Sequence, residues 1–228
     1  MDNPVIYQTE DGSDTLFMAD MNEHYHSVHG AISESFHIFI NGGYRFFIRQ
    51  DHIKVLEIGF GTGLNCLLTA LEAIRLNIQT EYFTIEKYPL TEELTGKLNY
   101  PALTGKTGNE IFQKIHASPW NEKVTIAPRF ELIKLDEDFL TISLESIREV
   151  DVIYFDAFAP VKQPDMWTNE LFRKLCLTLK PGGILLTFSA KGSVRRSLVS
   201  AGFVVERLPG PKGKREILRA IKRNIGLE

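Results

Sequence analysis

Residues 54–63 read KVLEIGFGTG, and this stretch decides the fold. Val55, Leu56 and Ile58 form a short apolar run, which is typical of a buried strand. Glycines at every second position follow, and apolar residues at helical spacing then predict a helix over 64–76. The order strand, glycine turn, helix predicts the first unit of a Rossmann-like α/β domain.

The glycine turn also predicts a ligand site, because glycine lets the backbone approach a ligand and free helix N–H groups can face it. The spacing Gly59-x-Gly61-x-Gly63 differs from the G-x-G-x-x-G pattern of dinucleotide sites. A second apolar run ends at Glu86, where a carboxylate suits the two hydroxyls of a ribose. We therefore expect S-adenosylmethionine as the ligand. The alternatives are NAD as the ligand, and a tight turn that binds no ligand.

Carboxylates follow three predicted strands, 81–86, 130–135 and 151–155, at their carboxyl ends. Ligands bind at that edge of an open α/β sheet. We expect Glu86 to hold the ribose and Asp156 to lie beside the transferred methyl group. Asp136, or its neighbour Leu135, is expected to lie against the adenine. The predicted cofactor-binding residues are Glu57, Gly59, Phe60, Gly61, Gly63, Asn65, Glu86, Lys87, Asp136 and Asp156.

The block after the fourth strand, FDAFAP (155–160), is informative about the substrate. It resembles the Asn/Asp-Pro-Pro-Tyr/Phe loop of methyltransferases that act on planar nitrogen. Asp156 is the predicted catalytic residue, because a carboxylate can orient an amine and help remove its proton. Phe158 would either stack on a base that has left its strand or pack in the core.

The remaining pattern predicts a seven-stranded, mostly parallel sheet of the class I methyltransferase type, closed by a hairpin of strands 203–208 and 216–221. Further helices are expected over 91–98, 109–116, 137–147, 170–179 and 193–201. Asn41-Gly42-Gly43 between two apolar runs predicts an N-terminal β-hairpin of strands 36–40 and 44–48. We therefore expect an N-terminal extension over 1–50 and one methyltransferase domain over 51–228. The segment around residues 25–35 either lines a site or forms a surface loop.

Composition narrows the class of protein. No apolar run approaches the length of about 20 residues that a membrane span needs. Cys66 and Cys176 are expected to be packed thiols in a reducing, cytoplasmic environment. The cluster His24, His26 and His29 lacks neighbouring cysteines, so no metal site is predicted. Residues 190–228 carry ten Lys or Arg and three Glu, against a net charge of −3 for the whole chain. This basic segment suggests a phosphate-rich partner or a solvated surface.

Several motifs together resemble one family. They are GFGTGLN (59–65), IEKYPL (85–90), FDAFAPVKQPDMW (155–167), TFSAKGSVRR (187–196) and GKREIL (213–218). These stretches resemble the methyltransferase domain of the bifunctional tRNA 5-methylaminomethyl-2-thiouridine biosynthesis proteins (MnmC). The resemblance implies methyl transfer from S-adenosylmethionine to the aminomethyl nitrogen of the wobble uridine. Because the sequence ends at Glu228 without a second glycine fingerprint, it resembles the stand-alone form (MnmD), and we expect no FAD.

The resemblance also implies partners and contacts. The tRNA anticodon stem-loop would be the macromolecular partner, and Asp156 would lie beside the reacting amine. Arg195, Arg196, Lys214 and Arg215 match basic positions of the family and would contact tRNA phosphates. Lys162, with Asp165 and Trp167, would shape the substrate pocket or brace the active-site loop. Two alternatives stay open: an N-methyltransferase for a small amine or a protein, and a non-catalytic tRNA-binding module.

Overall fold

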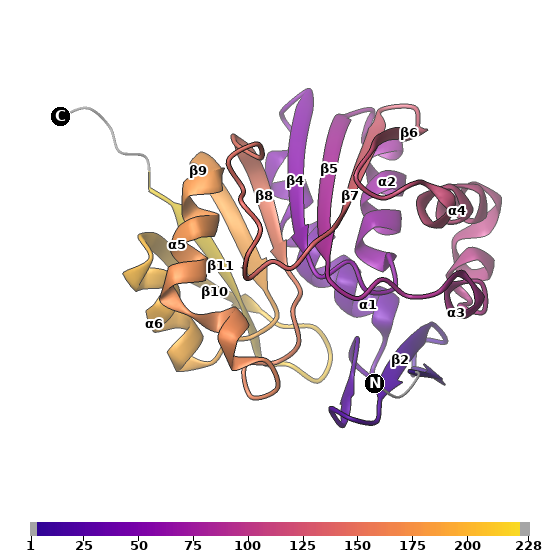
Figure 1. Cartoon of the computed structure of the whole chain (residues 1–228), viewed down its shortest axis with the longest axis horizontal. Coiled ribbons are helices and arrows are strands. Elements are labelled where there is room, and N and C mark those ends of the chain that lie inside the picture. The colour runs from indigo at the N-terminus through magenta and orange to yellow at the C-terminus, as the bar shows by residue number, and fades with distance from the viewer. Residues whose placement is uncertain (1–3, 224–228) are drawn as a thin grey trace.

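A central sheet of eight strands organises the computed structural model, which describes residues 4–223 (Figure 1). The sheet order is β10-β11-β9-β8-β4-β5-β7-β6. The strands are β4 (His52–Ile58), β5 (Gln79–Glu86), β6 (Lys123–Ala127), β7 (Phe130–Asp136), β8 (Val150–Phe155), β9 (Leu179–Thr187), β10 (Phe203–Pro209) and β11 (Glu216–Lys222). The five strands from β9 to β7 in that order run parallel, and β11, β10 and β6 are antiparallel to their neighbours.

The predicted fold class is confirmed, and all seven predicted strands are present. The additional strand is β6, a five-residue edge strand that pairs with β7 alone and whose first three residues are not fully buried. Such a short strand carries little periodic signal. The predicted boundary between an N-terminal extension (1–50) and a methyltransferase domain (51–228) stays a prediction. Residues 1–3 of the extension and 224–228 of the domain lie outside the described range.

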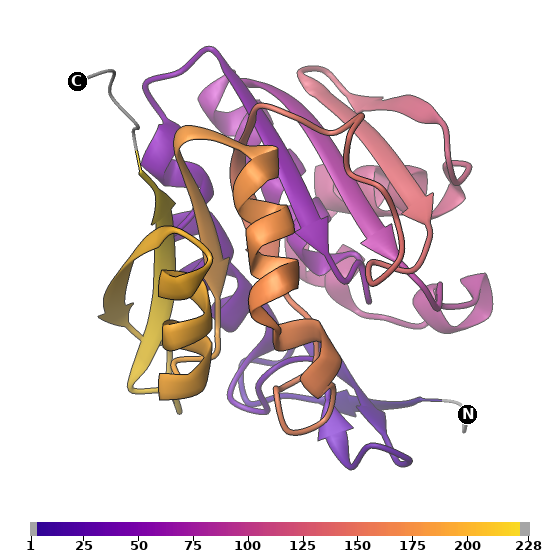
Figure 2. The same ribbon diagram turned by 60° about the vertical axis from the view of Figure 1, so that its left-hand side comes forward.

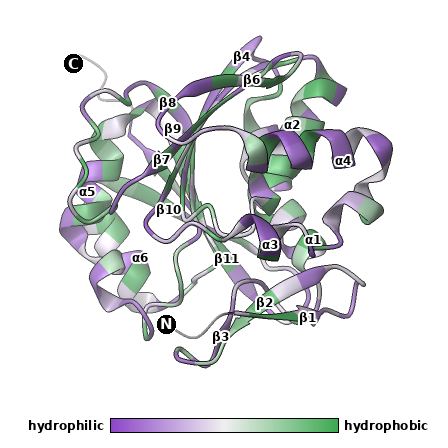
Figure 3. Ribbon diagram, turned by 45° about the vertical axis from the view of Figure 1, so that its right-hand side comes forward, coloured by the Kyte–Doolittle hydropathy of each residue, from purple (hydrophilic) through white to green (hydrophobic). Residues whose placement is uncertain are grey.

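Helices cover both faces of the sheet, because the side chains of the central strands alternate between two apolar clusters. Val55 and Tyr154 point into the cluster that α2 (Leu64–Leu76) and α4 (Tyr100–Ala117) cover. Leu56 and Phe155 point into the cluster that α5 (Asn169–Thr178) and α6 (Gly192–Ser200) cover. Helix α2 begins and ends where the sequence predicts, and it is largely hydrophobic in Figure 3. The short helix α3 (Glu92–Thr95) precedes α4.

The predicted hairpin of strands 36–40 and 44–48 is wrong. Phe36–Asn41 is a π-helix (η1), and Tyr44–Phe47 is a 3₁₀ helix (η2). Ile38, Phe39 and Ile40 are all buried, which a strand with one solvent face cannot achieve. Gly42 has a negative φ, and a Cβ there would lie 2.6 Å from the carbonyl oxygen of Ile38. The glycine is needed for close helical packing rather than for a hairpin turn.

The segment predicted as a helix over 137–147 is also irregular. Turns replace the helix, and the Asp138 carboxylate accepts a hydrogen bond from the backbone N–H of Leu140 at 2.9 Å. This side-chain contact offers the backbone an alternative to helical hydrogen bonds. The segment consequently runs over the edge of the sheet as a loop, next to the end of β7.

An N-terminal hairpin does exist, but it lies earlier in the chain than predicted. Strands β1 (Val5–Gln8), β2 (Asp14–Met18) and β3 (Glu23–His24) form a small antiparallel sheet, followed by α1 (Ala31–Ser35). Figure 2 shows this small sheet at the end of the large sheet toward which the parallel strands point. It therefore lies where the fold places ligands.

Hydrogen bonds fasten the small sheet to the start of α4. The backbone N–H of Asp14 donates to the Asn99 side chain at 2.9 Å, and the Asn99 N–H donates to the Asp14 carboxylate at 2.9 Å. The Asn99 amide also donates to the Gly12 carbonyl at 2.8 Å, and the Tyr100 hydroxyl donates to the Asp14 carbonyl at 2.6 Å. No helix within residues 4–223 is long and apolar enough to cross a membrane.

We expect Asn99→Ala to loosen the small sheet, because it removes the side-chain hydrogen bonds of Asn99 to Gly12 and Asp14. The cost should be about 1–3 kcal/mol, since partly buried partners lose their hydrogen bonds. Limited proteolysis should then cleave near residues 10–30 faster than in the unaltered chain. Lys97→Ala, which removes only an exposed ion pair with Glu93, is the control and should leave cleavage unchanged. Equal cleavage in both variants would contradict this account.

Candidate active site

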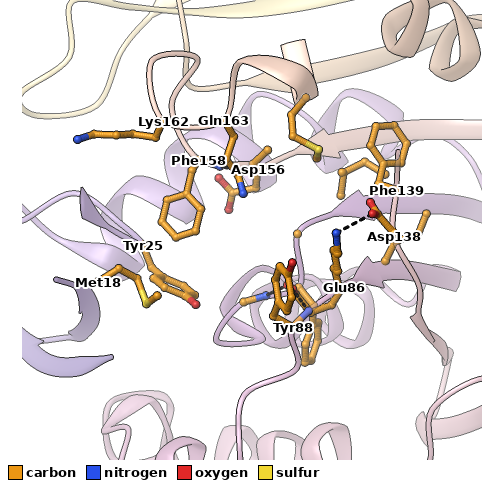
Figure 4. A pocket seen from close by; sticks show the side chains of 18 of the residues that line it. Met18, Tyr25, Glu86, Tyr88, Asp138, Phe139, Asp156, Phe158, Lys162 and Gln163 are labelled. Atoms are coloured by element: carbon orange, nitrogen blue, oxygen red, sulfur yellow. Dashed lines mark hydrogen bonds and ion pairs between the residues drawn. The ribbon is translucent and has the colours of Figure 1, made fainter. Parts of the chain in front are cut away.

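A cavity of about 380 Å³ opens at the carboxyl ends of β4, β5 and β8. This is the point where the strand order reverses: from β4 the chain first builds β5 and β7 on one side and later β8 and β9 on the other. Figure 4 shows two halves. Glu86, Tyr88, Asp138 and Phe139 line one half, and Met18, Tyr25, Phe158 and Lys162 line the other. Asp156 lies between them.

The glycine turn brings the β4 loop close to the end of β8. Gly59 has a φ of +91°, and a Cβ there would lie 2.8 Å from the carbonyl oxygen of Asp156. Gly61 has a φ of +50°, and its Cβ position is 3.2 Å from the Tyr25 ring. Both positions combine a left-handed backbone with close neighbours, so only glycine fits without strain. The turn thereby forms one wall of the cavity, with Gly59, Phe60 and Gly61 among the residues that line it.

Glu86 is held in place by backbone donors. One carboxylate oxygen accepts the Gly61 N–H at 3.1 Å, and the other accepts the Tyr88 N–H at 2.8 Å. A carboxylate has about four lone-pair sites, so two acceptor sites stay available to a ligand. The structure thus places Glu86 beside the glycine turn, and its expected contact with a ribose stays a prediction.

Asp136 does not line the cavity, whereas Asp138 does. Asp136 is exposed, and its backbone N–H donates to Asn121 at 3.3 Å. Asp138 pairs with Lys87 at 2.7 Å, and this hydrogen bond to Lys87 lowers the pKa of the Asp138 carboxyl. The sequence places Asp136 at the tip of β7, but the loop that replaces the predicted helix brings Glu137 and Asp138 to the cavity instead.

Asn65 and Asp156 are joined by a hydrogen bond. The Asn65 Nδ2 donates to an Asp156 carboxylate oxygen at 2.8 Å. Asn65 comes from the first turn of α2, directly after the glycine turn. Burial raises the pKa of Asp156 to about 7, although the hydrogen bond from Asn65 opposes the shift. A carboxyl that titrates near neutrality is well matched to proton transfer.

Glu57 lies behind the cavity rather than in its wall. Its side chain is fully buried on β4, and burial raises its pKa to about 8. Phe60 and Asn65 do line the cavity, as do Glu86 and Lys87. Gly63 does not line it; with a φ of +74° it is the residue directly before the first turn of α2.

The loop that carries Phe158 is braced from the interior. The Trp167 Nε1 donates to the Phe158 carbonyl at 2.9 Å, and the Phe158 N–H donates to the Gln163 side chain at 3.2 Å. Trp167 lies in the 3₁₀ helix η3 (Pro164–Trp167) and packs edge-on against Phe155. Trp167 therefore braces the loop, while Lys162 and Asp165 line the cavity. Phe158 is only partly buried, and its ring faces the cavity (Figure 4).

The N-terminal segment adds Met18 and Met21, which the sequence left unassigned, and of the 25–35 segment it brings Tyr25 and His26 to the cavity wall. Met18, Met21, Tyr25 and His26 line the cavity, and the Tyr25 ring packs edge-on against Phe158 with centroids 5.1 Å apart. Burial and the nearby Glu86 carboxylate raise the pKa of the Tyr25 hydroxyl to about 12. Burial lowers the pKa of His26 to about 4, so this imidazole is neutral at physiological pH. No spacing rule links residue 25 to residue 158, so only the fold brings them together.

The histidines of the 24–29 cluster have separate surroundings. His24 packs against Tyr7 and Phe17, and His29 contacts Glu10 at 2.9 Å. Within residues 4–223, no group of three or more His, Cys, Asp or Glu side chains is arranged to hold a metal ion.

The four predicted tRNA-contacting cations differ in their surroundings. Arg195, Arg196 and Arg215 are exposed, and no salt bridge in the described part of the chain engages them. Lys214 is instead paired with Glu34 and lies over the Phe188 ring. It joins the β10–β11 loop to the N-terminal segment, as Lys212 does through Glu10 at 2.7 Å. Three of the four cations are therefore free to meet phosphates.

Fold and site together define a class: a Rossmann-like domain with a cavity of ligand size between a glycine turn and an acidic strand end. Residues 110–223, half of the chain, match the family described as S-adenosyl-L-methionine-dependent methyltransferase. The chain belongs to this family of methyltransferases, and the predicted cofactor, S-adenosylmethionine, is confirmed.

The chain is similar to curated tRNA 5-methylaminomethyl-2-thiouridine biosynthesis bifunctional proteins MnmC. The relative from Pseudomonas putida is 34% identical over 206 residues, which is 85% of this chain and 31% of the relative. The relative from Pseudomonas fluorescens is 35% identical over 207 residues, which is 86% of this chain and 31% of the relative. The chain thus spans about a third of the length of these relatives.

Solved structures give the same picture. MnmC2 from Aquifex aeolicus superimposes with a TM-score of 0.83 at 26% identity, over 96% of this chain and 70% of that one. Spermidine synthase from Thermotoga maritima superimposes with a TM-score of 0.57 at 16% identity, over 97% and 70% of the two chains. The second likeness shows the shared fold alone.

The residues present fit S-adenosylmethionine. Glu86 keeps two free acceptor sites for ribose hydroxyls, and the glycine turn leaves space that a Cβ would fill. The cavity volume of about 380 Å³ lies within the usual range of about 300–1,000 Å³ for small-molecule sites.

We expect Glu86→Ala to weaken S-adenosylmethionine binding by about 10–100-fold, because hydrogen bonds to a charged group contribute about 1.5–3 kcal/mol. Asp136→Ala removes a carboxylate from the neighbouring strand end, outside the cavity, and should change the affinity by less than about twofold. Titration calorimetry with both purified variants makes the comparison. A similar loss of affinity in the two variants would show that Asp136 contributes to cofactor binding.

Asp156 should make the fold less stable as the pH rises. Its carboxyl ionises near 4 in the unfolded chain and near 7 in the fold, so the native state binds more protons between these values. Stability therefore falls across this range. Three pKa units correspond to about 4 kcal/mol, so Asp156→Asn should be more stable by up to about 4 kcal/mol at pH 8 and nearly equal at pH 4. The Tm at pH 8 should rise by up to about 8–16 °C. A Tm difference that does not depend on pH would contradict the raised pKa.

Proposed function

We propose that this chain methylates tRNA: it transfers a methyl group from S-adenosylmethionine to the aminomethyl nitrogen of wobble 5-aminomethyl-(2-thio)uridine, giving 5-methylaminomethyl-(2-thio)uridine. The observation that carries the proposal is Asp156. It lies between the half of the cavity that Glu86 lines, where the cofactor would bind, and an aromatic corner formed by Tyr25 and Phe158. Its pKa is near neutrality. The names of the MnmC relatives, and the 0.83 TM-score with MnmC2, support the substrate.

The chemistry of the substrate amine fits Asp156. When bound, S-adenosylmethionine supplies an electrophilic methyl group. An aliphatic amine is mostly protonated at pH 7, and its lone pair is free only after a proton leaves. The Asp156 carboxylate would accept a hydrogen bond from this nitrogen, orient it, and take up the proton. Asn65 would hold the carboxylate through the 2.8 Å hydrogen bond.

The aromatic corner would hold the base. Tyr25 and Phe158 pack edge-on, and Met18 lies beside Tyr25 at the same side of the cavity (Figure 4). A base that is unstacked from an anticodon loop can be held against aromatic side chains in this way. Lys162 at the cavity wall would face the adjoining backbone phosphate, and Arg195, Arg196 and Arg215 would contact phosphates further along the stem-loop. Such a tRNA substrate would place the activity in the cytoplasm.

The decisive experiment measures methyl incorporation from labelled S-adenosylmethionine into two bulk tRNA preparations. One preparation comes from cells that lack this gene, and the other from cells that lack the aminomethyl-forming pathway. We expect incorporation into the first only. Asp156→Ala should lower turnover by about 10²–10⁴-fold, the usual contribution of a positioned acid or base, with cofactor affinity within several-fold. Asp136→Ala is the matched control and should retain activity.

Other results would change the proposal in defined ways. Equal incorporation into both preparations would point to another tRNA position. No incorporation, with cofactor binding intact, would favour a small amine or a protein as substrate, and absent cofactor binding would favour a non-catalytic module. Binding assays separate these cases, since tRNA affinity should fall steeply with salt. Each of Arg195→Ala, Arg196→Ala and Arg215→Ala should reduce the salt slope by about 1.

A further inference from the structure

Five buried polar atoms gather around Glu57 on the interior side of Asp156. Within residues 4–223, both Glu57 carboxyl oxygens, the Asn65 Oδ1, the Tyr82 hydroxyl and the Thr84 hydroxyl have no hydrogen-bond partner. Glu57 lies opposite Thr84 on β5 and opposite Tyr154 on β8. A buried polar group without a partner is costly, so a cluster of five needs an explanation.

A proton on Glu57 would supply the donor that the Asn65 Oδ1 lacks. The Asn65 Oδ1 can only accept, and an ionised Glu57 could also only accept. An ionised Glu57 would therefore leave the Asn65 Oδ1 without a donor from this side chain. The hydroxyls of Tyr82 and Thr84 can donate in either charge state of Glu57, so they do not decide its protonation. With one proton on Glu57, its O–H can donate to the Asn65 Oδ1.

The electrostatic surroundings also favour a neutral Glu57. Four titratable groups interact electrostatically with Glu57. They are Asp156 beyond Asn65, Tyr82 on β5, Tyr154 on β8 and Cys66 on α2. None of these carries a positive charge. The nearest basic side chain in this network, Lys134, acts on Cys66 and donates instead to the carbonyls of Ile115 and His116 at the end of α4. Burial, together with the Asp156 carboxylate, raises the pKa of Glu57 to about 8, although the nearby Thr84, Asn65 and Tyr82 side chains oppose the shift.

We propose that Glu57 is a positioning residue that stays protonated and, by donating to the Asn65 Oδ1, fixes the amide so that its Nδ2 donates to Asp156. Glu57 then acts on the reaction without touching cofactor or substrate. The role replaces the cofactor contact expected from the sequence, because Glu57 lies outside the cavity wall.

The orientation of the amide matters because Asn65 offers a donor on one side and an acceptor on the other. In the observed orientation, the Nδ2 donates to the Asp156 carboxylate and favours its charged form. If the amide turned over, its Oδ1 would face the carboxylate, and the charged form would be disfavoured. The consequence for turnover rests on the proposed function, but the protonation of Glu57 and the titration of Asp156 do not.

The first measurement is infrared difference spectroscopy between the unaltered protein and Glu57→Gln at pH 6.5. We expect the C=O stretch of a protonated carboxyl to be lost in the variant. If the variant instead loses the bands of an ionised carboxylate, Glu57 is charged and the proposal is overturned. This measurement needs no tRNA, so it stands even if the proposed function fails, and Glu57→Gln is neutral and nearly isosteric, so the fold should be retained.

The second measurement follows the titration of Asp156, from infrared differences between each background and its Asp156→Asn derivative. Glu57→Gln keeps a donor toward the Asn65 Oδ1 and should leave the Asp156 midpoint within about 0.3 pH units. Glu57→Leu removes the donor and should raise the midpoint by about one pH unit. An unchanged midpoint in Glu57→Leu would overturn the proposal, as would a rise of about one pH unit in Glu57→Gln.

Kinetics supply the functional readout. The acid limb of the kcat/KM profile should move to higher pH in Glu57→Leu by the same amount as the Asp156 midpoint. S-adenosylmethionine affinity should stay within about threefold in both variants, since hydrogen bonds to the cofactor are unchanged. Rescue of the profile by Glu57→Gln separates positioning from a general loss of packing. A cofactor affinity that falls more than tenfold in Glu57→Gln would show instead that Glu57 contacts the cofactor.

Discussion

The site depends on parallel pairing of β4 with both β5 and β8, because this pairing continues past the strand ends. The Gly59 N–H donates to the Ile85 carbonyl, and the Asp156 N–H donates to the Ile58 carbonyl, both at 3.0 Å. These bonds fix the glycine turn, Glu86 and Asp156 in one register. The expected ribose acceptor, Glu86, and the proposed proton acceptor, Asp156, are therefore positioned by backbone hydrogen bonds, before any side-chain contact is made.

The small N-terminal sheet completes the cavity, and polar contacts fix it at two places. Asp14 and Asn99 connect it to α4, while Glu10 and Lys212 connect it to the β10–β11 loop. The first connection is partly buried and uses hydrogen bonds, whereas the second is an exposed ion pair of small energetic value. The attachment to α4 is consequently the stronger one. It places Tyr25 against Gly61 and Phe158, so that the aromatic corner is built from segments more than 130 residues apart in the sequence.

The sequence predicts correctly those elements that have a regular local pattern of apolar residues and glycines. The strand at 54–58, the glycine turn and the helix over 64–76 have strong local patterns, and the acids at strand ends follow from the topology of a parallel sheet. Sequence reasoning failed where tertiary packing decides. Asn41-Gly42-Gly43 predicts a hairpin, yet Ile38, Phe39 and Ile40 before it are all buried, and both flanking segments form helical turns. The choice between Asp136 and Asp138 depended on a loop whose backbone bonds to the Asp138 carboxylate. The sequence left open whether the segment that begins at Tyr25 lines a site or forms a surface loop, since no local pattern records which strand ends a distant loop will cover.

Two acids with raised pKa values, Glu57 and Asp156, lie on either side of one amide, and in the described part of the chain neither forms a salt bridge with a cation. Each would be more stable in the fold as a neutral amide or an apolar residue of similar size. Their positions differ, however. Asp156 reaches the cavity, and its titration near neutrality makes it a suitable proton acceptor. Glu57 is buried in the core, and burial raises its pKa to about 8, above that of Asp156. One carboxyl can thus change its charge during turnover while the other, held neutral, keeps the hydrogen-bond donor that orients the amide between them.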